Sequence, residues 1–424
     1  MREGWEIRKL GEICEFSNGL WKGKKPPYLK VGVIRNTNFT RDGRLDDSDI
    51  VYLDVEKSQF LKRKLLHGDI ILEKSGGGPK QPVGRVIIFD KEEGDFSFSN
   101  FTSAIRISNP SEVDFNYLHR FLFFSYISGA TETMQSHSTG IRNLKFDKYK
   151  SIPIPLPPLP EQQRIVSILN KAFAAIGKAK INAEQNLKNA KELFESYLQG
   201  VFDTSTSSGL GREGWEEKRL KEITTKIGSG ATPRGGKASY KNEGISLVRS
   251  MNVHDFEFRD KNLALIDERQ ADALSNVILH KDDVLLNITG ASIARCCLIP
   301  EQYLPARVNQ HVSIIRAKQN VINPSFLCSA LTSKYYKDQI LETGEQGATR
   351  QAITKAQLES FRISFPKART EQERVIKQID VLSLESNKLQ TLYSKKLLAL
   401  EELKKSLLQK AFSGELTTIK EPVP

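Results

Sequence analysis

Two glycine-rich stretches in this chain carry the residue types that bind phosphate. One runs from Lys74 to Lys80 as KSGGGPK, and the other runs from Asn287 to Ser292 as NITGAS; each follows a strand-like run. Glycine lets backbone amides approach an anion closely, and the cations Lys74, Lys80 and Arg295 would add charge. An ordinary tight loop has a similar composition, so both interpretations stay open on these residues alone.

Further loops that combine glycine with a cation occur in matched pairs. STGIRN, with Arg142, is matched later by QGATRQ, with Arg350, and an early KGKK loop is matched by RGGK. Paired loops of this kind favour a surface that binds a polyanion. The cations that we expect on this surface are Lys22, Lys24, Lys25, Lys74, Lys80, Arg142, Arg234, Lys237, Arg295 and Arg350.

The pairing of the loops reflects a duplication of the whole sequence. REGWE begins at Arg2 and again at Arg212, and EQQR at Glu161 returns as EQER at Glu371, each 210 positions later. Two copies with so long a period indicate a duplicated domain pair, because solenoid units run to roughly 20 to 50 residues. The chain should therefore carry two related sites.

The composition of the 424 residues predicts a soluble, folded and basic protein. Hydrophobic residues make up 39%, the net charge is +12, and no long uncharged apolar run is present. The charged start is no signal peptide, and the four cysteines and six histidines show no metal-ligand spacing. Cys296 and Cys297 are adjacent and poorly placed for an ordinary disulfide. We expect a cytoplasmic, reducing location and no metal.

Strands and short helices must position these loops. Alternating and β-branched runs predict strands at 28–34, 69–72, 85–89 and 104–107, with counterparts at 246–249, 283–288, 294–299 and 312–315. Aromatic stretches predict short helices at 117–126 and 326–335. Each copy therefore begins as a mixed α/β domain.

A proline-containing break in each copy is followed by a long charged segment with a heptad seam. Helices of about 40 residues would be about 60 Å long. One seam is rich in small residues and the other in leucine, which favours an antiparallel coiled coil within the chain; the alternative is that each helix packs on its own globular domain. Asn186 and Lys396 would weaken the seam but could fix its register. The larger residues expected to pack are Leu169, Ile176, Leu193, Tyr197, Ile379, Leu382, Leu389, Tyr393, Leu400, Leu403 and Leu407.

Motifs for catalysis are not visible. The closest approaches to a [DN]PP[FY] methyltransferase motif, at Asn109 and Asn323, lack the second proline, and no GxxxxGK[ST] or GxSxG motif occurs. Glu402 and Lys404 spell part of a nuclease site but fall within the heptads. We expect no catalytic residues and no cofactor on this chain.

Taken in order, these features resemble the specificity subunit of type I restriction-modification systems. The likeness rests on the GWE openings, on the GDIIL and DDVLL strands that lead into glycine loops, on the late Gly-x-x-Arg loops, and on the EQxR helix starts. It spans nearly the whole chain. In copy two, Arg369-Thr stands where prolines are expected before EQER, and Lys281 stands where glycine is expected before the strand.

The resemblance implies two target recognition domains of mixed α/β fold in tandem duplicate, joined by two long helices. Each domain would read one half of a bipartite DNA site, and Asn287 and Gln351 are candidate readers of base edges. The helices would set the spacing and dock two methyltransferase subunits, with restriction and translocation subunits as further partners. S-adenosylmethionine, ATP and magnesium would belong to those partners. The expected boundaries are 1–155 and 212–366 for the recognition domains, 156–202 and 367–413 for the helical spacers, 203–211 for a linker and 414–424 for a tail.

Two other classes of protein stay open on the sequence. A solitary nuclease or modification enzyme would cleave or methylate DNA by itself, and a basic coiled-coil adapter would bind proteins and no DNA. Two separated protected patches on DNA would distinguish the recognition subunit from both.

Overall fold

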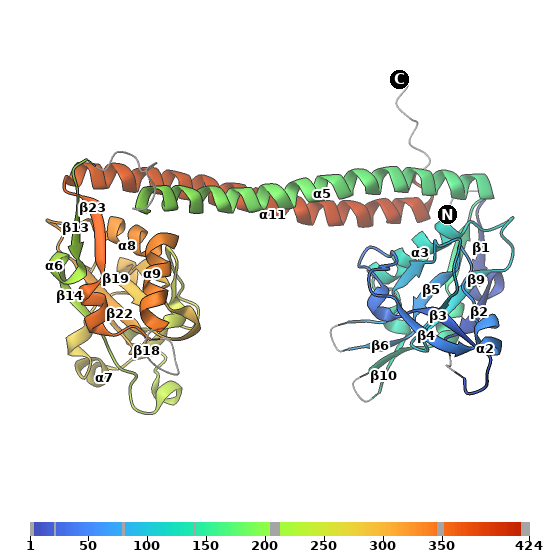
Figure 1. Cartoon of the computed structure of the whole chain (residues 1–424), viewed down its shortest axis with the longest axis horizontal. Helices are drawn as coiled ribbons and strands as arrows, with labels where there is room; N and C mark the ends of the chain where they lie inside the picture. The colour runs from blue at the N-terminus through green and yellow to red at the C-terminus, as the bar shows by residue number, and fades with distance from the viewer. Residues whose placement is uncertain are drawn as a thin grey trace, which may run out of the picture. The chain divides into compact units, whose positions relative to one another are not determined.

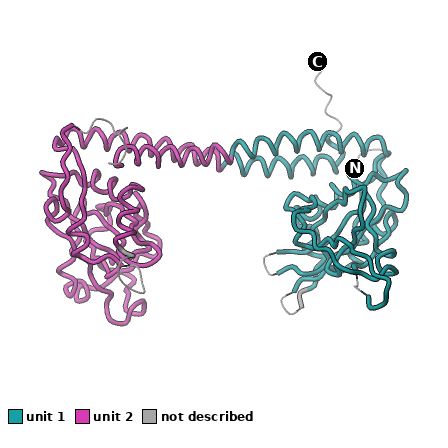
Figure 2. Tube along the Cα trace, viewed as in Figure 1, with its two compact units in different colours: residues 1–183, 395–424 teal, residues 184–394 magenta. Residues whose placement is uncertain are grey.

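The computed structural model describes residues 4–20, 23–78, 81–138, 141–203, 213–345 and 352–416 (Figure 1). The chain forms two compact units, residues 1–183 with 395–424 and residues 184–394 (Figure 2). Each unit therefore combines one globular part with segments of both long helices. The chain is described below one unit at a time.

Unit 1 is built around a four-stranded antiparallel sheet in the order β2-β9-β5-β7. A three-stranded sheet, β4-β3-β8, contains the parallel pair β3 and β8. The strands are β1 (Glu6–Lys9), β2 (Cys14–Asn18), β3 (Tyr28–Ile34), β4 (Val51–Glu56), β5 (Ile70–Glu73), β6 (Ser75–Gly77), β7 (Val86–Ile88), β8 (Phe96–Phe98), β9 (Thr102–Ile107), β10 (Gln135–Ser138), β11 (Ile141–Leu144) and β12 (Pro153–Leu156). The short helices are α1 (Leu10–Ile13), α2 (Lys57–Leu61), α3 (Phe115–Ile127) and α4 (Phe146–Lys150).

Unit 2 repeats this plan with a sheet in the order β14-β22-β19-β20 and a second sheet, β18-β15-β21, in which β15 and β21 are parallel. Its strands are β13 (Trp215–Arg219), β14 (Thr224–Ser229), β15 (Ile245–Val248), β16 (Val253–His254), β17 (Glu257–Phe258), β18 (Ala264–Ile266), β19 (Val284–Asn287), β20 (Cys296–Leu298), β21 (Ala306–Val308), β22 (Val312–Ala317) and β23 (Arg362–Pro366). Its short helices are α6 (Leu220–Ile223), α7 (Glu268–Asp272), α8 (Pro324–Thr332), α9 (Lys334–Glu345) and α10 (Lys355–Ser360). The strand orders confirm that the sequence repeat is a structural repeat.

The central strand of each unit is buried on both faces. Successive side chains of a strand point to opposite faces, so Ile70 and Leu72 of β5 join a core with α3 while Ile71 joins a separate core. In β19, Val284 and Leu286 likewise face one cluster. Continuous apolar runs such as these are typical of strands covered on both sides.

A buried aspartate stands before each of these strands. In unit 1, the carboxylate of Asp69 binds Arg106 at 2.6 and 2.8 Å and accepts the Leu66 backbone N–H at 2.8 Å. In unit 2, Asp283 binds Arg316 at 2.7 and 2.8 Å and accepts the backbone N–H of His280. The aspartate that recurs in the sequence thus fixes the turn into the strand and ties that strand to its neighbour.

The EQxR motif of each copy fastens a long helix to its globular part. Gln162, in α5 (Leu159–Phe202), donates to the carbonyls of Glu112 and Pro157, both at 2.8 Å, and accepts the Asp114 N–H. Its side chain is fully buried. The amide thereby satisfies three backbone groups at the junction, which explains the glutamine physically.

Gln372, in α11 (Arg369–Ser413), makes the same set of bonds in unit 2. It donates to Val321 and Pro366 carbonyls at 3.1 and 2.8 Å and accepts the N–H of Asn323 at 2.7 Å. Both junctions therefore have the same geometry.

Within unit 1, the first part of α5 packs against the last part of α11. Lys180 pairs with Glu401 at 2.6 Å. The ring of Phe412, near the end of α11, lies 5.1 to 5.8 Å from the rings of Tyr117, Phe121 and Phe124. The end of the chain's last helix is thus part of the core of unit 1.

Within unit 2, the last part of α5 packs against the first part of α11. Ser386 donates to the carbonyl of Ala190 at 2.7 Å, and the Tyr197 hydroxyl donates to Gln378 at 2.9 Å. Contacts that move forward along α5 move backward along α11, so the pairing is antiparallel. The small side chains at 190 and 386 allow this close approach of the backbones.

The predicted helix seam is wrong at two of its large residues. Leu193 and Leu403 are 58% and 46% exposed, whereas Phe194 and Lys404 are partly buried. Lys404 places its ammonium 5.1 and 5.3 Å from the rings of Phe123 and Phe173, so its alkyl stem covers apolar surface. In a heptad repeat, one of the two seam positions can lie three or four residues after the other. The sequence prediction chose Leu193 over Phe194 and Leu403 over Lys404, and both choices were wrong.

The other predicted packing residues lie on the inner faces. Asn186 and Lys396, also expected in the seam, are exposed. The residues that are buried or partly buried are Leu169, Ile176, Tyr197, Ile379, Leu382, Leu389, Tyr393, Leu400 and Leu407.

Candidate nucleic-acid interface

The glycine loop of unit 1 lies against the late loop of the same unit. β6 pairs with β11, which places Gly77 opposite Arg142 and Ser75 opposite Asn143. The Ser75 hydroxyl donates to Asn143 Oδ1 at 2.6 Å. Two loops that the sequence predicted separately therefore form one small sheet with β10.

Two glycines of this loop are required by the backbone. Gly76 has a φ of +103°, a conformation that glycine adopts without strain. A Cβ on Gly77 would lie 2.4 Å from the carbonyl oxygen of Gln81. Gly78 differs, because a Cβ there would meet no described atom within 4 Å. The loop is thus tightly built at its base and open at its outer end.

Two of the predicted cations of unit 1 lie at this loop. The Lys74 ammonium donates to Asn18 Oδ1 at 2.8 Å, and partial burial lowers the pKa of Lys74. Arg142 is half-buried, with Nη1 3.5 Å from Gln135 Oε1. The structure therefore brings these two cations to one surface.

The early basic loop is exposed where it is described. Lys24 and Lys25 donate their backbone N–H groups to one oxygen of Glu56, both at 3.2 Å, and leave their side chains in solvent. Lys22 and Lys80 lie outside the described residues. A carboxylate thus fixes the loop through its main chain while the ammonium groups face outward.

A cavity of about 470 Å³ opens beside the glycine loop of unit 1. Asn36 donates to the Ser75 carbonyl at 2.8 Å, and the half-exposed Phe101 accepts the Lys74 N–H. Asn36 Oδ1 and Ser99 Oγ are buried without a partner among the described residues. Sequence reasoning missed this cavity, because its lining combines segments that lie far apart in the sequence. The lining residues are Leu20, Val33, Arg35, Asn36, Thr37, Leu53, Val55, Ser99, Asn100 and Phe101.

Unit 2 joins its glycine loop to its late loop in a similar way. Thr289 forms an antiparallel bridge with Ala352, and Ile353 donates its N–H to the Ile288 carbonyl at 2.8 Å. Arg350 and Gln351 lie outside the described residues. Ala352 and Ile353, which follow these residues, lie against the glycine loop.

Asn287 does not face solvent, and the prediction that it reads a base edge is wrong. The side chain is fully buried, and its amide donates to the carbonyls of Ser250 at 2.9 Å and Val253 at 3.4 Å. The sequence placed it at the end of a strand beside glycine, but the inward face of that strand position could not be told from spacing. Asn287 is a structural residue of unit 2.

The side chains beside the two glycine loops differ in chemistry. In unit 2, His311 occupies the place of Phe101, because its carbonyl accepts the Ile288 N–H at 3.0 Å as the Phe101 carbonyl accepts the Lys74 N–H at 3.0 Å. The His311 ring is half-buried, and its Nδ1 lies 2.6 Å from the Thr289 hydroxyl. The frame is thus shared, while the phenyl ring of unit 1 is replaced by an imidazole in unit 2.

The remaining predicted cations of unit 2 are accessible. Arg234 and Lys237 are exposed, and Arg234 lines a cavity of about 530 Å³ with Arg269 and Gln270. Arg295 is half-buried at the start of β20, with Nη1 3.5 Å from His254 Nδ1.

Several titratable groups are held neutral by burial. Burial raises the pKa of the Cys14 thiol to about 12 and lowers the pKa of His119 to about 3. All four cysteines are free and buried. Among the residues that the structure describes, no three His, Cys, Asp or Glu side chains are grouped to hold a metal, and no helix is long and apolar enough to span a membrane.

Two α/β domains that share one frame and present different loop chemistry define a duplicated binding protein. A comparison with protein families identifies which one: residues 2–185 and 212–397 each match the model of the type I restriction modification DNA specificity domain. The chain belongs to this family.

Individual relatives match over nearly the whole length. The StySPI type I restriction enzyme specificity subunit of Salmonella potsdam is 22% identical, with 98% of this chain and 90% of the relative covered. The EcoKI specificity subunit of Escherichia coli strain K12 is 23% identical over 98% of this chain and 90% of its own. The expected family and fold class are confirmed.

Solved structures share the fold. A chain from a study of complex assembly in a type I R-M system superposes with a TM-score of 0.77 at 19% identity, covering 98% of this chain and 99% of its own. The HsdS subunit of Thermoanaerobacter tengcongensis gives a TM-score of 0.65 at 18% identity, covering 98% of both chains.

Proposed function

We propose that this chain is the sequence-specific DNA-recognition subunit of a type I restriction-modification complex, with each globular part reading one half of an asymmetric, bipartite site. The observation that carries this proposal is the repeated frame with unlike side chains, Phe101 in one unit and His311 in the other. Equivalent positions that carry different chemistry recognise different bases, so the two half-sites differ.

Cations around the loops anchor the DNA backbone. Lys24, Lys25, Arg234 and Lys237 are exposed and able to neutralise phosphates, and the net charge of +12 supports this. Phosphate contacts fix position on the duplex, whereas polar and apolar loop side chains read the base edges. Lys22, Lys80, Arg350 and Gln351 remain candidates for DNA contact from the sequence.

The long helices serve as a spacer and as a docking surface for modification subunits. Each helix carries apolar side chains that stay exposed within its own unit, including Ile181 and Leu398 in unit 1 and Val381, Leu384 and Leu392 in unit 2. We assign these exposed apolar residues to the docking surface for the modification subunits.

Catalysis belongs to the partner subunits in this proposal. Two methyltransferase subunits supply the S-adenosylmethionine chemistry, and restriction subunits use ATP and magnesium. This chain supplies no catalytic group and works with these partners in the cytoplasm.

Mapping of methylated bases in the host genome tests the proposed function. A strain that contains this chain is expected to methylate a motif of two defined blocks, and deletion of the gene is expected to remove that methylation. Methylation that persists after deletion contradicts the proposal. Cleavage or methylation of DNA by the purified chain alone would support the solitary enzyme instead.

A further inference from the structure

Arg85 of unit 1 and Arg295 of unit 2 are equivalent residues with different surroundings. In unit 1, Glu73 donates its N–H to the Arg85 carbonyl, and Gly84 donates to the Glu73 carbonyl. In unit 2, Asn287 donates to Arg295, and Ala294 donates to Asn287, in the same pattern. Arg295 is therefore the counterpart of Arg85, and Asn287 is the counterpart of Glu73.

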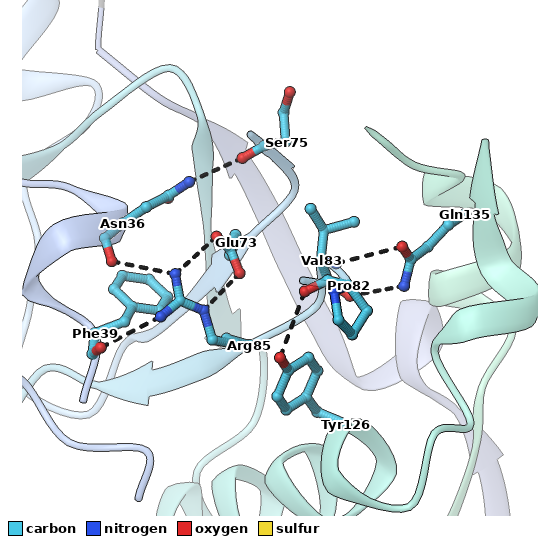
Figure 3. A network of polar contacts seen from close by, with 9 residues as sticks. All are labelled: Asn36, Phe39, Glu73, Ser75, Pro82, Val83, Arg85, Tyr126 and Gln135. Carbon is cyan, nitrogen blue, oxygen red and sulfur yellow. Dashed lines mark hydrogen bonds and ion pairs between the residues drawn. The ribbon is translucent and has the colours of Figure 1, made fainter. Parts of the chain in front are cut away.

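Arg85 is fully committed inside unit 1 (Figure 3). Its guanidinium binds both carboxylate oxygens of Glu73, at 2.7 and 2.8 Å, and donates to the carbonyls of Asn36 and Phe39 at 3.3 and 3.4 Å. It also lies 5.5 Å from the Phe39 ring centroid, and the hydrogen bond to Glu73 raises the pKa of Arg85. A guanidinium with its carboxylate this close carries little net charge toward a ligand.

In unit 2, Asn287 makes the two hydrogen bonds to backbone carbonyls that Arg85 makes in unit 1. Its amide donates to the carbonyls of Ser250 and Val253, which occupy the places of Asn36 and Phe39 after strands β15 and β3. One uncharged side chain thus satisfies the two carbonyls that an arginine satisfies in unit 1. No carboxylate is needed there, and none is provided.

Arg295 is therefore not needed for hydrogen bonds inside unit 2. Among the described residues, its guanidinium has no carboxylate partner, and Nη1 lies 3.5 Å from His254 Nδ1. It lies three residues after the Gly290–Ser292 turn, where a Cβ on Gly290 would meet nothing within 4 Å. A cation without an internal counter-charge beside an open loop is suited to an external acceptor.

We propose that Arg295 binds DNA directly in the half-site read by unit 2, whereas Arg85 is structural and does not contact DNA. This inference rests on the proposed function. The ligand chemistry is a pair of oxygen or nitrogen acceptors, which a backbone phosphate or the O6 and N7 edge of a guanine can supply. Unit 2 therefore contributes one contact that unit 1 does not have.

Equilibrium binding by the full chain, purified with its modification subunits, tests this role. The probe is a 60-bp duplex, a length of about six helical turns, that carries the motif found methylated in the host. Arg295→Gln is expected to weaken binding about 5- to 150-fold. Lys334→Gln removes an equally positive but exposed and ion-paired charge from unit 2 and is expected to change binding less than about twofold.

A second variant keeps the test decisive if Arg295→Gln folds poorly. Asn287→Glu restores the pair of unit 1, so Arg295 is expected to turn inward and bind the new carboxylate. Binding should then fall as much as in Arg295→Gln while the melting temperature is retained. Asn287→Glu that binds DNA as tightly as the wild type overturns the inference.

The salt dependence distinguishes the two sources of acceptors. If the partner is a phosphate, the loss is the same for all sequences and the slope of log K against log salt falls by about 1. If the partner is a guanine, the loss is confined to duplexes with that base pair. Unchanged binding by Arg295→Gln overturns the role of Arg295 alone, whereas wild-type complex that does not prefer the motif over a scrambled duplex overturns the proposed function as well.

Discussion

Replacing Asp283 by alanine is expected to destabilise unit 2 by about 3 to 5 kcal/mol, because it leaves the Arg316 guanidinium without its buried partner. The Asp283 carboxylate is fully buried, binds Arg316 at 2.7 and 2.8 Å, and accepts the His280 N–H at 2.7 Å. The same change at Asp69, which pairs with Arg106, is expected to destabilise unit 1 by less, because the Arg106 side chain is 43% exposed and water can solvate its charge. Asp69 and Asp283 are the aspartates of the GDIIL and DDVLL motifs.

Hydrogen exchange resolved by strand measures this effect in the two-unit chain. In Asp283→Ala, the free energy of the opening reaction that exposes the amides of β19 and β22 should fall by about 3 to 5 kcal/mol. Asp338→Ala is the matched control, since Asp338 forms an exposed pair with Lys334 on a helix, and it should leave exchange unchanged. Equal effects of the two substitutions would refute the structural role of the buried aspartate.

Exchange of residues 212–366 for the same segment of another family member is expected to change one block of the recognised motif and leave the other block intact. Both ends of this segment leave from one two-stranded sheet, in which Trp215 pairs with Pro366. The Gln372 amide binds main-chain atoms of Val321, Asn323 and Pro366, so other side chains at those positions keep the junction as long as residue 323 retains its N–H.

Methylation maps of cells that carry the hybrid measure this outcome. The reciprocal exchange of residues 1–155 is the control and should change the other block. Phe202 packs on Phe326 with ring centroids 5.4 Å apart, so the donor segment needs an apolar residue there to fold. A folded hybrid that recognises two new blocks would contradict the independence of the two domains.

Much of the fold could be predicted from the sequence because its signals are local. The strand expected at 28–34 is observed at Tyr28–Ile34, and the run at 69–72 became β5 at Ile70–Glu73. Apolar runs bounded by turn residues specify strands through side-chain pattern alone. The starts of the two long helices could also be predicted from local signals. Proline directly precedes one EQxR motif, and the glutamine of each motif binds the helix to its domain.

Features that depend on tertiary contacts could not be predicted. The seam error at Leu193 and Leu403 arose because a heptad repeat leaves one position ambiguous until the partner helix is known. Asn287 was misjudged because its burial depends on the carbonyls of a distant turn. The pairing of β6 with β11, and the cavity beside Phe101, join segments that no spacing in the sequence relates.

Footprinting of DNA by the full chain together with its modification subunits tests the central claim most directly. Two domains that each read one half-site predict two protected patches on the methylated motif, separated by an accessible gap and unlike each other in sequence. A single continuous patch, or no protection of the motif, would contradict recognition by two separate domains.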